Sequence, residues 1–236
     1  MPPERVSKII SACGVSSRRE AESLIIAGRV TVRGVPAVLG QKAEQGVDEI
    51  AIDGVPLARS GEYVYIMLNK PRGYVTTMSD EHGRNTIVSL VEQLGIRVYP
   101  VGRLDMDSEG LLLMTNDGAF ANAVAHPSGN LAKTYEARVR GDINAAASRM
   151  RLPMDIGPHR VCALSVEVLE QSTGGGTLSV AIAEGRNRQV RKMCALCGLT
   201  VVALKRVSIG DLELGELGTG RWRHLTQEER EGLTEQ

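Results

Sequence analysis

Residues 101–118 read VGRLDMDSEGLLLMTNDG and place three acids within five positions, with an arginine two positions before the first of them. An apolar run follows at once. Side chains alternate along a strand, so Arg103 and Asp105 would share one face of the segment that enters this loop. A carboxylate beside a cation, at the edge of an apolar run, is a candidate covalent nucleophile. Asp105 is therefore the first candidate catalytic residue of the chain.

Two simpler interpretations of the same acids stay open on the local sequence. The spacing D-x-D-x-E-G from Asp105 to Gly110 matches the opening of an EF-hand calcium loop. The twelfth place of that loop holds Asn116 instead of the bidentate glutamate, and residues 97–104 contain proline and glycine and read as extended. The other interpretation is a polar turn whose acids only cap backbone groups.

Three further blocks follow the same order as a known signature: LNKPRG at 68–73, KTY at 133–135 and EGRNRQVRKM at 184–193. Together with GRLD and the run GLLLMTNDG, they resemble the catalytic signature of bacterial ribosomal RNA pseudouridine synthases of the RsuA/RluB type. Residues 4 to about 54 separately resemble the small S4 RNA-binding domain. The resemblance covers nearly the whole chain.

The resemblance implies roles for individual side chains. It assigns Asp105 as the essential carboxylate, Tyr135 as the ring that stacks on an extruded uracil, and Arg191 as the basic partner of Asp105. Arg188 is the alternative partner, and Arg103 is expected to contact the RNA beside the extruded nucleotide. From the residues alone, Tyr135 would be a core residue on a strand face, and both candidate partners would bind phosphate or water. Lys70 and Pro71 of the first block are expected to shape the loop beneath the site.

The expected reaction is the isomerisation of a uridine in ribosomal RNA to pseudouridine, with no cofactor and no metal. The 186–189 block and the GLLL run favour large-subunit 23S RNA, either free or in an assembling subunit. Two alternatives stay open: a synthase that acts on 16S ribosomal RNA or transfer RNA, and a non-catalytic S4-type RNA-binding ribosome-assembly factor. Loss of Asp105 would identify the non-catalytic protein, and Asp105 is present with its whole block.

The net charge is zero, from 28 basic and 28 acidic residues, which does not by itself indicate a nucleic-acid partner. The basic residues cluster, however. The candidates for RNA contact, besides Arg103, are Arg18, Arg19, Arg33, Arg186, Arg188 and Lys192. Arg18 and Arg19 fall in the first turn of an expected helix, where cations oppose the helix dipole and a bound phosphate would relieve that cost.

The pattern of elements predicts an α+β chain of two domains. Residues 1–58 form the S4 domain, with helices over 5–13 and 17–28, the latter begun by a Ser17–Glu20 capping box, and a small sheet through 30–32 and 50–52. Residues 62–236 form the catalytic domain. Its strands are joined mostly by hairpins or single helices, which predicts a mixed, largely antiparallel sheet flanked by helices. From about residue 228 the chain reads as a flexible acidic tail.

The predicted elements of the catalytic domain are strands over 63–69, 135–139, 161–169, 177–183 and 205–209, and helices over 86–94, 118–126 and 189–199. The three glycines at 174–176 are expected in a hairpin loop. Cys194 and Cys197 lie in the last helix and read as two semi-buried thiols, since a single such pair is a weak zinc signal. No apolar run approaches 18 residues and no signal-like start is present, so we expect a soluble, cytoplasmic monomer.

Overall fold

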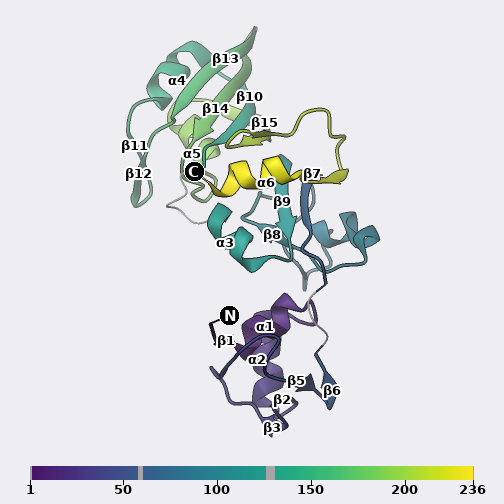
Figure 1. Cartoon of the computed structure of the whole chain (residues 1–236). Helices are drawn as coiled ribbons and strands as arrows, with labels where there is room; N and C mark the ends of the chain where they lie inside the picture. The colour runs from purple at the N-terminus through teal and green to yellow at the C-terminus, as the bar shows by residue number, and fades with distance from the viewer. Residues whose placement is uncertain (1, 58–60, 126–130, 236) are drawn as a thin grey trace. The chain divides into compact units, whose positions relative to one another are not determined.

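The computed structural model describes residues 2–57, 61–125 and 131–235. The chain divides into two compact units (Figure 1). The smaller unit consists of Met1–Val64, Gly95–Val98 and Asn116–Gly118, and the larger unit of Tyr65–Leu94, Tyr99–Thr115 and Ala119–Gln236. None of the helices within the described ranges is long and apolar enough to cross a membrane.

The smaller unit packs two helices against short strands. Its elements are β1 (Glu4–Arg5), α1 (Val6–Ala12), α2 (Arg18–Ile26), β2 (Val30–Val32), β3 (Val35–Pro36), β4 (Lys42–Ala43), β5 (Ile50–Ile52) and β6 (Val55–Pro56). The strands form a β3-β2-β5-β6 sheet and a β1-β4 pair. The predicted capping box is confirmed, because Ser17 and Glu20 bond each other's backbone N–H at the start of α2. Ile9, Ile25 and Val30 lie in one core cluster.

The larger unit is built on one sheet, to which nine strands of the described chain contribute. They are β7 (Tyr65–Lys70), β8 (Tyr99–Val101), β9 (Glu109–Thr115), β10 (Lys133–Arg140), β13 (Ser165–Ser172), β14 (Gly175–Ile182), β15 (Thr200–Ile209), β16 (Leu212–Glu213) and β17 (Trp222–His224). The order is β13-β14-β10-β15-β9-β7-β17, with β16 on β15 and β8 on β9. Only β9 with β15 is parallel among these pairings. The predicted mixed, largely antiparallel sheet is confirmed.

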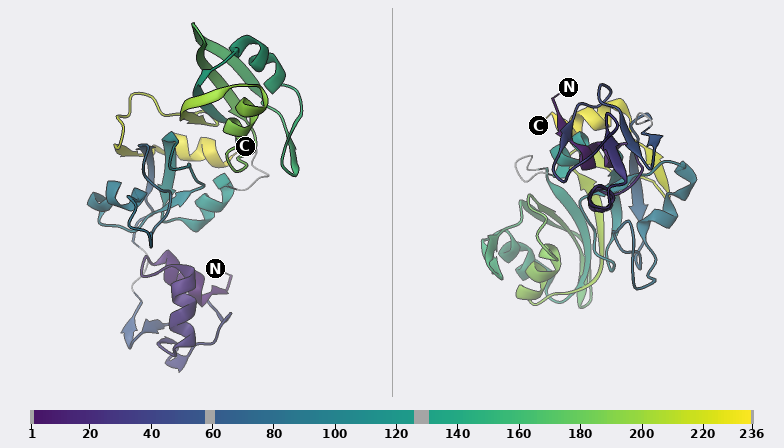
Figure 2. Two further views of the ribbon diagram at one scale, coloured as in Figure 1. Left: turned by 180° about the vertical axis from the view of Figure 1, so that it is seen from behind. Right: turned by 90° about the horizontal axis from the view of Figure 1, so that it is seen from below.

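Helices flank this sheet, as Figures 1 and 2 show from several sides. They are α3 (Gly118–Ala125), α4 (Ile143–Met150), α5 (Gln189–Leu196) and α6 (Gln227–Thr234), with the 3₁₀ turns η1 (Ile87–Leu90) and η2 (Glu92–Leu94) and a separate hairpin of β11 (Met154–Ile156) and β12 (His159–Val161). Leu111 and Leu113 of β9 share a core cluster with Phe120 of α3 and Leu233 of α6. Leu112, on the opposite face, is also fully buried. The apolar run is therefore a strand covered on both faces.

The expectation of a flexible acidic tail is wrong. Gln227–Thr234 form α6, which begins with a capping box between Thr226 and Glu229. Arg223 makes two hydrogen bonds to the Glu229 carboxylate, at 2.7 and 2.6 Å, and Leu233 is buried. The acids lie on the solvent side of a helix that a single inward leucine fixes to the core.

Three smaller differences concern the bounds of elements. The helix predicted over 86–94 is two short 3₁₀ turns. The strand predicted over 161–169 is divided, since β12 ends at Val161 and β13 begins at Ser165. Gly175 and Gly176 belong to β14, where a Cβ on either would lie 2.2 Å from a carbonyl oxygen of the neighbouring strand. These glycines allow close strand approach, and only Gly174 lies in the turn with a positive φ of 81°.

Candidate active site

The loop between β8 and β9 carries Asp105, and its backbone is fixed on both sides of that residue. The Thr76 Oγ1 donates to the Leu104 carbonyl oxygen at 2.6 Å and accepts from the Leu104 N–H at 3.3 Å. The Ser108 N–H donates to the Asp105 carbonyl oxygen at 3.0 Å and closes a turn. The Asp105 side chain is about one-third exposed.

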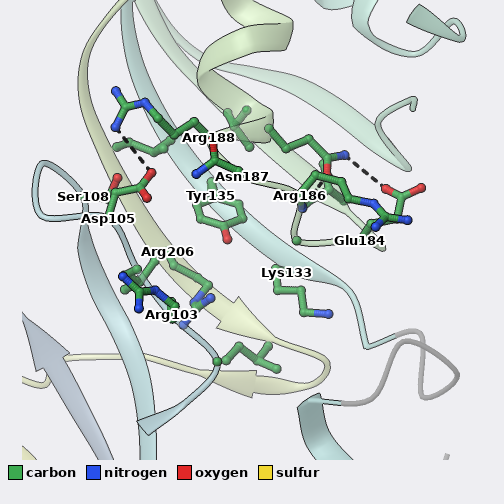
Figure 3. A pocket seen from close by; sticks show the side chains of 18 of the residues that line it. Arg103, Asp105, Ser108, Lys133, Tyr135, Glu184, Arg186, Asn187, Arg188 and Arg206 are labelled. Atoms are coloured by element: carbon green, nitrogen blue, oxygen red, sulfur yellow. Dashed lines mark hydrogen bonds and ion pairs between the residues drawn. The ribbon is translucent and has the colours of Figure 1, made fainter. Parts of the chain in front are cut away.

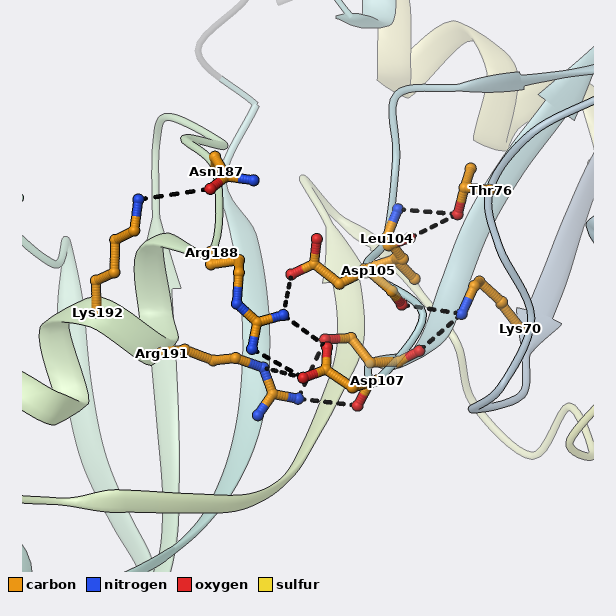
Figure 4. Close-up of polar contacts among 10 residues, drawn as sticks. Lys70, Thr76, Leu104, Asp105, Asp107, Asn187, Arg188, Arg191 and Lys192 are labelled. Atoms are coloured by element: carbon orange, nitrogen blue, oxygen red, sulfur yellow. Dashed lines mark hydrogen bonds and ion pairs between the residues drawn. The ribbon is translucent and has the colours of Figure 1, made fainter. Parts of the chain in front are cut away.

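Lys70, at the end of β7, holds the same loop from its buried side (Figure 4). Its Nζ donates to the carbonyl oxygens of Pro71 at 3.1 Å, Asp105 at 3.1 Å and Ser108 at 2.9 Å. Burial lowers the pKa of Lys70 to about 8, and the carboxylates of the loop oppose that shift. A fully buried ammonium with three carbonyl acceptors shapes the loop, which is the role that the sequence suggested for this residue.

The carboxylate of Asp105 makes one ion pair with the described residues. The Arg188 Nη1 lies 3.5 Å from its Oδ2, and no described residue donates a hydrogen bond to either side-chain oxygen. Arg188 itself is the N-cap of α5 and has a left-handed backbone, with φ +54°. Asp105 is thus an accessible carboxylate with a cation beside it.

Arg191, which the resemblance assigns as the basic partner of Asp105, makes its described contacts with Asp107 and Ser108. The Arg191 Nη2 donates to the Asp107 carbonyl oxygen at 2.8 Å and lies 3.4 Å from the Ser108 Oγ, while its Nε lies 3.4 Å from the Asp107 Oδ2. Burial lowers the pKa of Arg191, and the charges of Asp107 and Asp105 oppose that shift. Arg191 contributes its charge near Asp105 without a described hydrogen bond or ion pair to that side chain, and Arg188, the alternative partner, makes the contact.

Asp105 lies at the wall of a cavity of about 500 Å³ (Figure 3). Of the predicted residues, the cavity brings together Arg103, Asp105, Tyr135, Arg186 and Arg188. Tyr135 projects from β10, where it pairs with Val180 on one side and Arg206 on the other. It is 8% exposed and lines the cavity, so its ring is part of the cavity wall. An aromatic face and a carboxylate at one cavity are the parts needed to hold and react with a planar ring.

Sequence reasoning did not assign Arg206 and Lys133 to the site, yet both line this cavity. The Arg206 Nε donates to the Leu111 carbonyl oxygen at 2.8 Å, and its buried Nη2 has no partner among the described residues. Burial and then the Arg206 charge lower the pKa of Lys133, whereas Glu184 raises it. Arg206 is in phase with the buried Leu204 along β15, which was the available signal for an inward arginine. These cations suit a ligand rich in carbonyl or phosphate oxygens.

The segment before α5 is held by a buried glutamine. The Gln189 Nε2 donates to the Glu184 carboxylate at 3.1 Å, and its Oε1 accepts from the Arg186 N–H at 3.1 Å. Gln189 is 2% exposed, so these bonds fix the turn that presents Arg186 and Arg188 to the cavity.

The remaining predicted residues lie away from the cavity. Lys192 is exposed on α5, with its Nζ 3.5 Å from the Asn187 Oδ1. Arg18 and Arg19 are exposed at the start of α2, and Arg33 pairs with Asp48, all within the smaller unit. The two acids that would open a calcium loop face arginines instead. Cys194 is buried, and burial raises the pKa of its thiol to about 12.

Comparison with known proteins agrees with this geometry. Residues 64–196 match the model of a family described as RNA pseudouridylate synthase, and this range contains Asp105, Tyr135 and Arg191. A solved structure described as the crystal structure of pseudouridylate synthase has a TM-score of 0.67 and 31% sequence identity. The match covers 97% of this chain and 99% of that one.

Two relatives match over nearly their whole length. A protein of Bacillus subtilis named ribosomal large subunit pseudouridine synthase B is 41% identical over 234 residues, which are 96% of this chain and 93% of that protein. An uncharacterized RNA pseudouridine synthase of Aquifex aeolicus is 39% identical over 228 residues, 95% and 91% of the two chains. With the acid, the ring and the arginines gathered at one cavity, these matches show that the chain belongs to the RNA pseudouridylate synthase family and is an RNA pseudouridine synthase, an isomerase.

Proposed function

We propose that this enzyme converts a specific uridine of large-subunit ribosomal RNA to pseudouridine, with Asp105 as the essential carboxylate. The observation that carries the proposal is the position of Asp105 at a cavity that Tyr135 and Arg188 also line. The name of the Bacillus subtilis relative supports the large-subunit target.

The reaction breaks the bond between ribose C1′ and uracil N1 and forms a bond between C1′ and C5. The proton on C5 leaves and N1 gains a proton, so the change is an isomerisation in which no electrons are exchanged with another molecule. Asp105 has the freedom for this chemistry, because Arg188 compensates its charge without donating a hydrogen bond to it. Tyr135 offers its face to the extruded base, and Arg206 and Lys133 offer donors to its carbonyl oxygens or phosphate.

The target is tested by mapping pseudouridines in ribosomal RNA from cells that lack the protein, with either the wild-type or the Asp105→Asn gene restored. We expect one or a few uridines of the large-subunit RNA to be modified with the wild-type gene alone. Sites confined to small-subunit or transfer RNA would overturn the proposed target. An unchanged map in all three strains would overturn the proposed activity on ribosomal RNA.

Tyr135 is expected to act through its ring face. Tyr135→Phe should bind the target RNA about as well as wild type, whereas Tyr135→Leu should lose on the order of 1–3 kcal/mol of binding free energy. Titration of labelled RNA with each variant measures this, and Tyr74→Leu, at a half-buried tyrosine outside the cavity, is the control. Equal affinities for the Phe and Leu variants would exclude stacking. Slow turnover by a tightly bound Phe variant would show that the hydroxyl group also moves a proton.

The smaller unit is proposed to bind RNA electrostatically, through the exposed Arg18 and Arg19. Replacing both by alanine should weaken RNA binding and reduce the slope of log affinity against log salt by roughly one unit per lost phosphate contact. Affinities measured at several salt concentrations give that slope. Arg29→Ala is the control, because Asp53 already pairs with its guanidinium through two hydrogen bonds. A slope that stays at the wild-type value would mean that Arg18 and Arg19 are only solvated.

A further inference from the structure

Asp107, the second acid of the loop, is the residue on which both arginines of the site converge (Figure 4). Its carboxylate accepts a two-pronged pair from Arg188, with Nη1 at 3.0 Å and Nη2 at 2.9 Å. Arg191 donates to its carbonyl oxygen at 2.8 Å and places Nε 3.4 Å from its Oδ2. Neither the sequence signature nor the proposed chemistry gives this acid a role.

The contacts of Asp107 and Asp105 differ in kind. A two-pronged arginine–carboxylate pair is short, directional and strong, whereas the single 3.5 Å approach of Arg188 to Asp105 is only an ion pair. The hydrogen bonds from Arg188 keep the pKa of Asp107 below its ordinary value, so this acid stays ionised. Arg188 is 41% exposed and has a left-handed backbone, so it needs a fixed partner if its guanidinium is to stay in one place.

We propose that Asp107 is a positioning residue that acts through Arg188 and Arg191. Asp107 accepts hydrogen bonds from both Nη atoms of Arg188. It thereby keeps the guanidinium beside Asp105 and prevents it from forming a two-pronged pair with both Asp105 oxygens. Asp105 thereby has a cation beside it, and both of its carboxylate oxygens stay free to react. The inference rests on the proposed role of Asp105 as the reacting carboxylate.

Loss of the Asp107 carboxylate should therefore slow chemistry without weakening RNA binding. In Asp107→Asn the two Nη atoms of Arg188 lose their carboxylate partner. The guanidinium can then pair with Asp105 and occupy the reacting oxygens. The lost negative charge lies in a site that receives a polyanion, so affinity for RNA should stay the same or rise. Asp107→Glu keeps the charge and both acceptor oxygens and should recover a large part of the rate.

The experiment measures the single-turnover rate on saturated RNA, and separately the affinity for the same RNA, in full-length variants. We expect Asp107→Asn to lose about 10- to 100-fold in rate, as for loss of a charge-assisted hydrogen bond, and Asp107→Glu to be several-fold faster than Asp107→Asn. Glu109→Gln is the matched control. It also removes one negative charge, two residues after Asp107, but Glu109 has no described bond to either arginine. Its rate should equal that of wild type.

The double variant Asp107→Asn/Arg188→Met distinguishes the proposed positioning role of Asp107 from a purely structural one. If the released guanidinium is what blocks Asp105, the double variant should be faster than the product of the two single losses predicts. Multiplicative losses, a wild-type rate for Asp107→Asn, or an equal loss in Glu109→Gln would each overturn the inference. If Asp107→Asn does not fold, Asp107→Ser takes its place in the same comparisons. Full turnover by Asp105→Asn would instead overturn the proposed function itself.

Discussion

Asp105→Asn protein should form no measurable pseudouridine, which corresponds to a loss on the order of 10⁴-fold or more in single-turnover rate. The amide has the shape of the carboxylate but neither its charge nor its nucleophilic oxygen, so no step that needs the carboxylate can proceed. The protein should still fold, because the Asp105 side chain is partly exposed and its one described contact is the 3.5 Å ion pair with Arg188. Affinity for RNA should not fall, since the change removes a negative charge.

The measurement uses a ribosomal RNA fragment that spans the mapped uridine, folded in monovalent salt and chelator. Wild-type protein should turn over under these conditions, since the proposed chemistry gives no step to a metal. Asp211→Asn, at an exposed turn, is the control for a general effect of losing one carboxylate and should be as active as wild type. Turnover by Asp105→Asn within tenfold of wild type would remove Asp105 from the chemistry. Activity of the wild-type protein that returns only with calcium would revive the EF-hand interpretation.

The features that could be predicted from sequence are those fixed by local chemistry. The capping box at Ser17 and Glu20 needs only residues three positions apart, and it starts α2 where expected. The apolar run after Asp105 has to be buried wherever it lies, so it becomes a central strand. The alternation of strands with hairpins and single helices was enough to predict a mixed sheet. Each of these outcomes depends on short-range rules that tertiary packing reinforces.

The pairing of arginines with acids could not be predicted in the same way. Arg188 and Arg191 are three residues apart at the start of α5, so the sequence does not show which of the two reaches the loop. The choice depends on Arg188 adopting a left-handed backbone, which turns its side chain toward Asp105 and Asp107. The burial of Arg206 is also difficult to predict from sequence. It depends on β9 and β10 lying on either side of β15.

The C-terminal helix α6 is an element that the sequence did not predict, for the same reason: its position depends on contacts with distant parts of the chain. Four acids between residues 228 and 235 suggested solvent exposure, and the acids are indeed compatible with water. The decisive residue is Leu233, which is buried in the core cluster that β7, β9 and α3 complete. The members of this cluster on β7, β9 and α3 are more than a hundred residues away in sequence. The Thr226–Glu229 capping box is a local signal for a helix, but no local pattern shows that Leu233 is buried against those strands.

Replacement of Gly110 should destabilise the fold strongly. It lies on β9 directly after the loop that carries Asp105, and it pairs with Lys70 on one side and Arg206 on the other. A Cβ there would lie 2.2 Å from the Arg206 carbonyl oxygen and 2.7 Å from the Arg206 nitrogen, both backbone atoms, and the φ of Gly110 is +105°. Backbone atoms cannot rotate away as a side chain can. The parallel contact of β9 with β15 would have to open, and with it the cavity wall that Asp105 and Arg206 share.

Gly110→Ala should accordingly cost more than about 4 kcal/mol in the free energy of unfolding, which is at the extreme for a single substitution. Gly157→Ala is the matched control: its φ of +66° is also strained, but no atom lies within 4 Å of the added Cβ. The control should cost only about 1–2 kcal/mol, so the difference between the two isolates the collision from the backbone strain. Urea denaturation of both variants gives the comparison, and recovery of Gly110→Ala only in the insoluble fraction would agree with the larger cost. If the two variants unfold at the same urea concentration with wild-type activity, β9 and β15 are not pressed together at Gly110. Their contact then does not hold the loop of Asp105 in place.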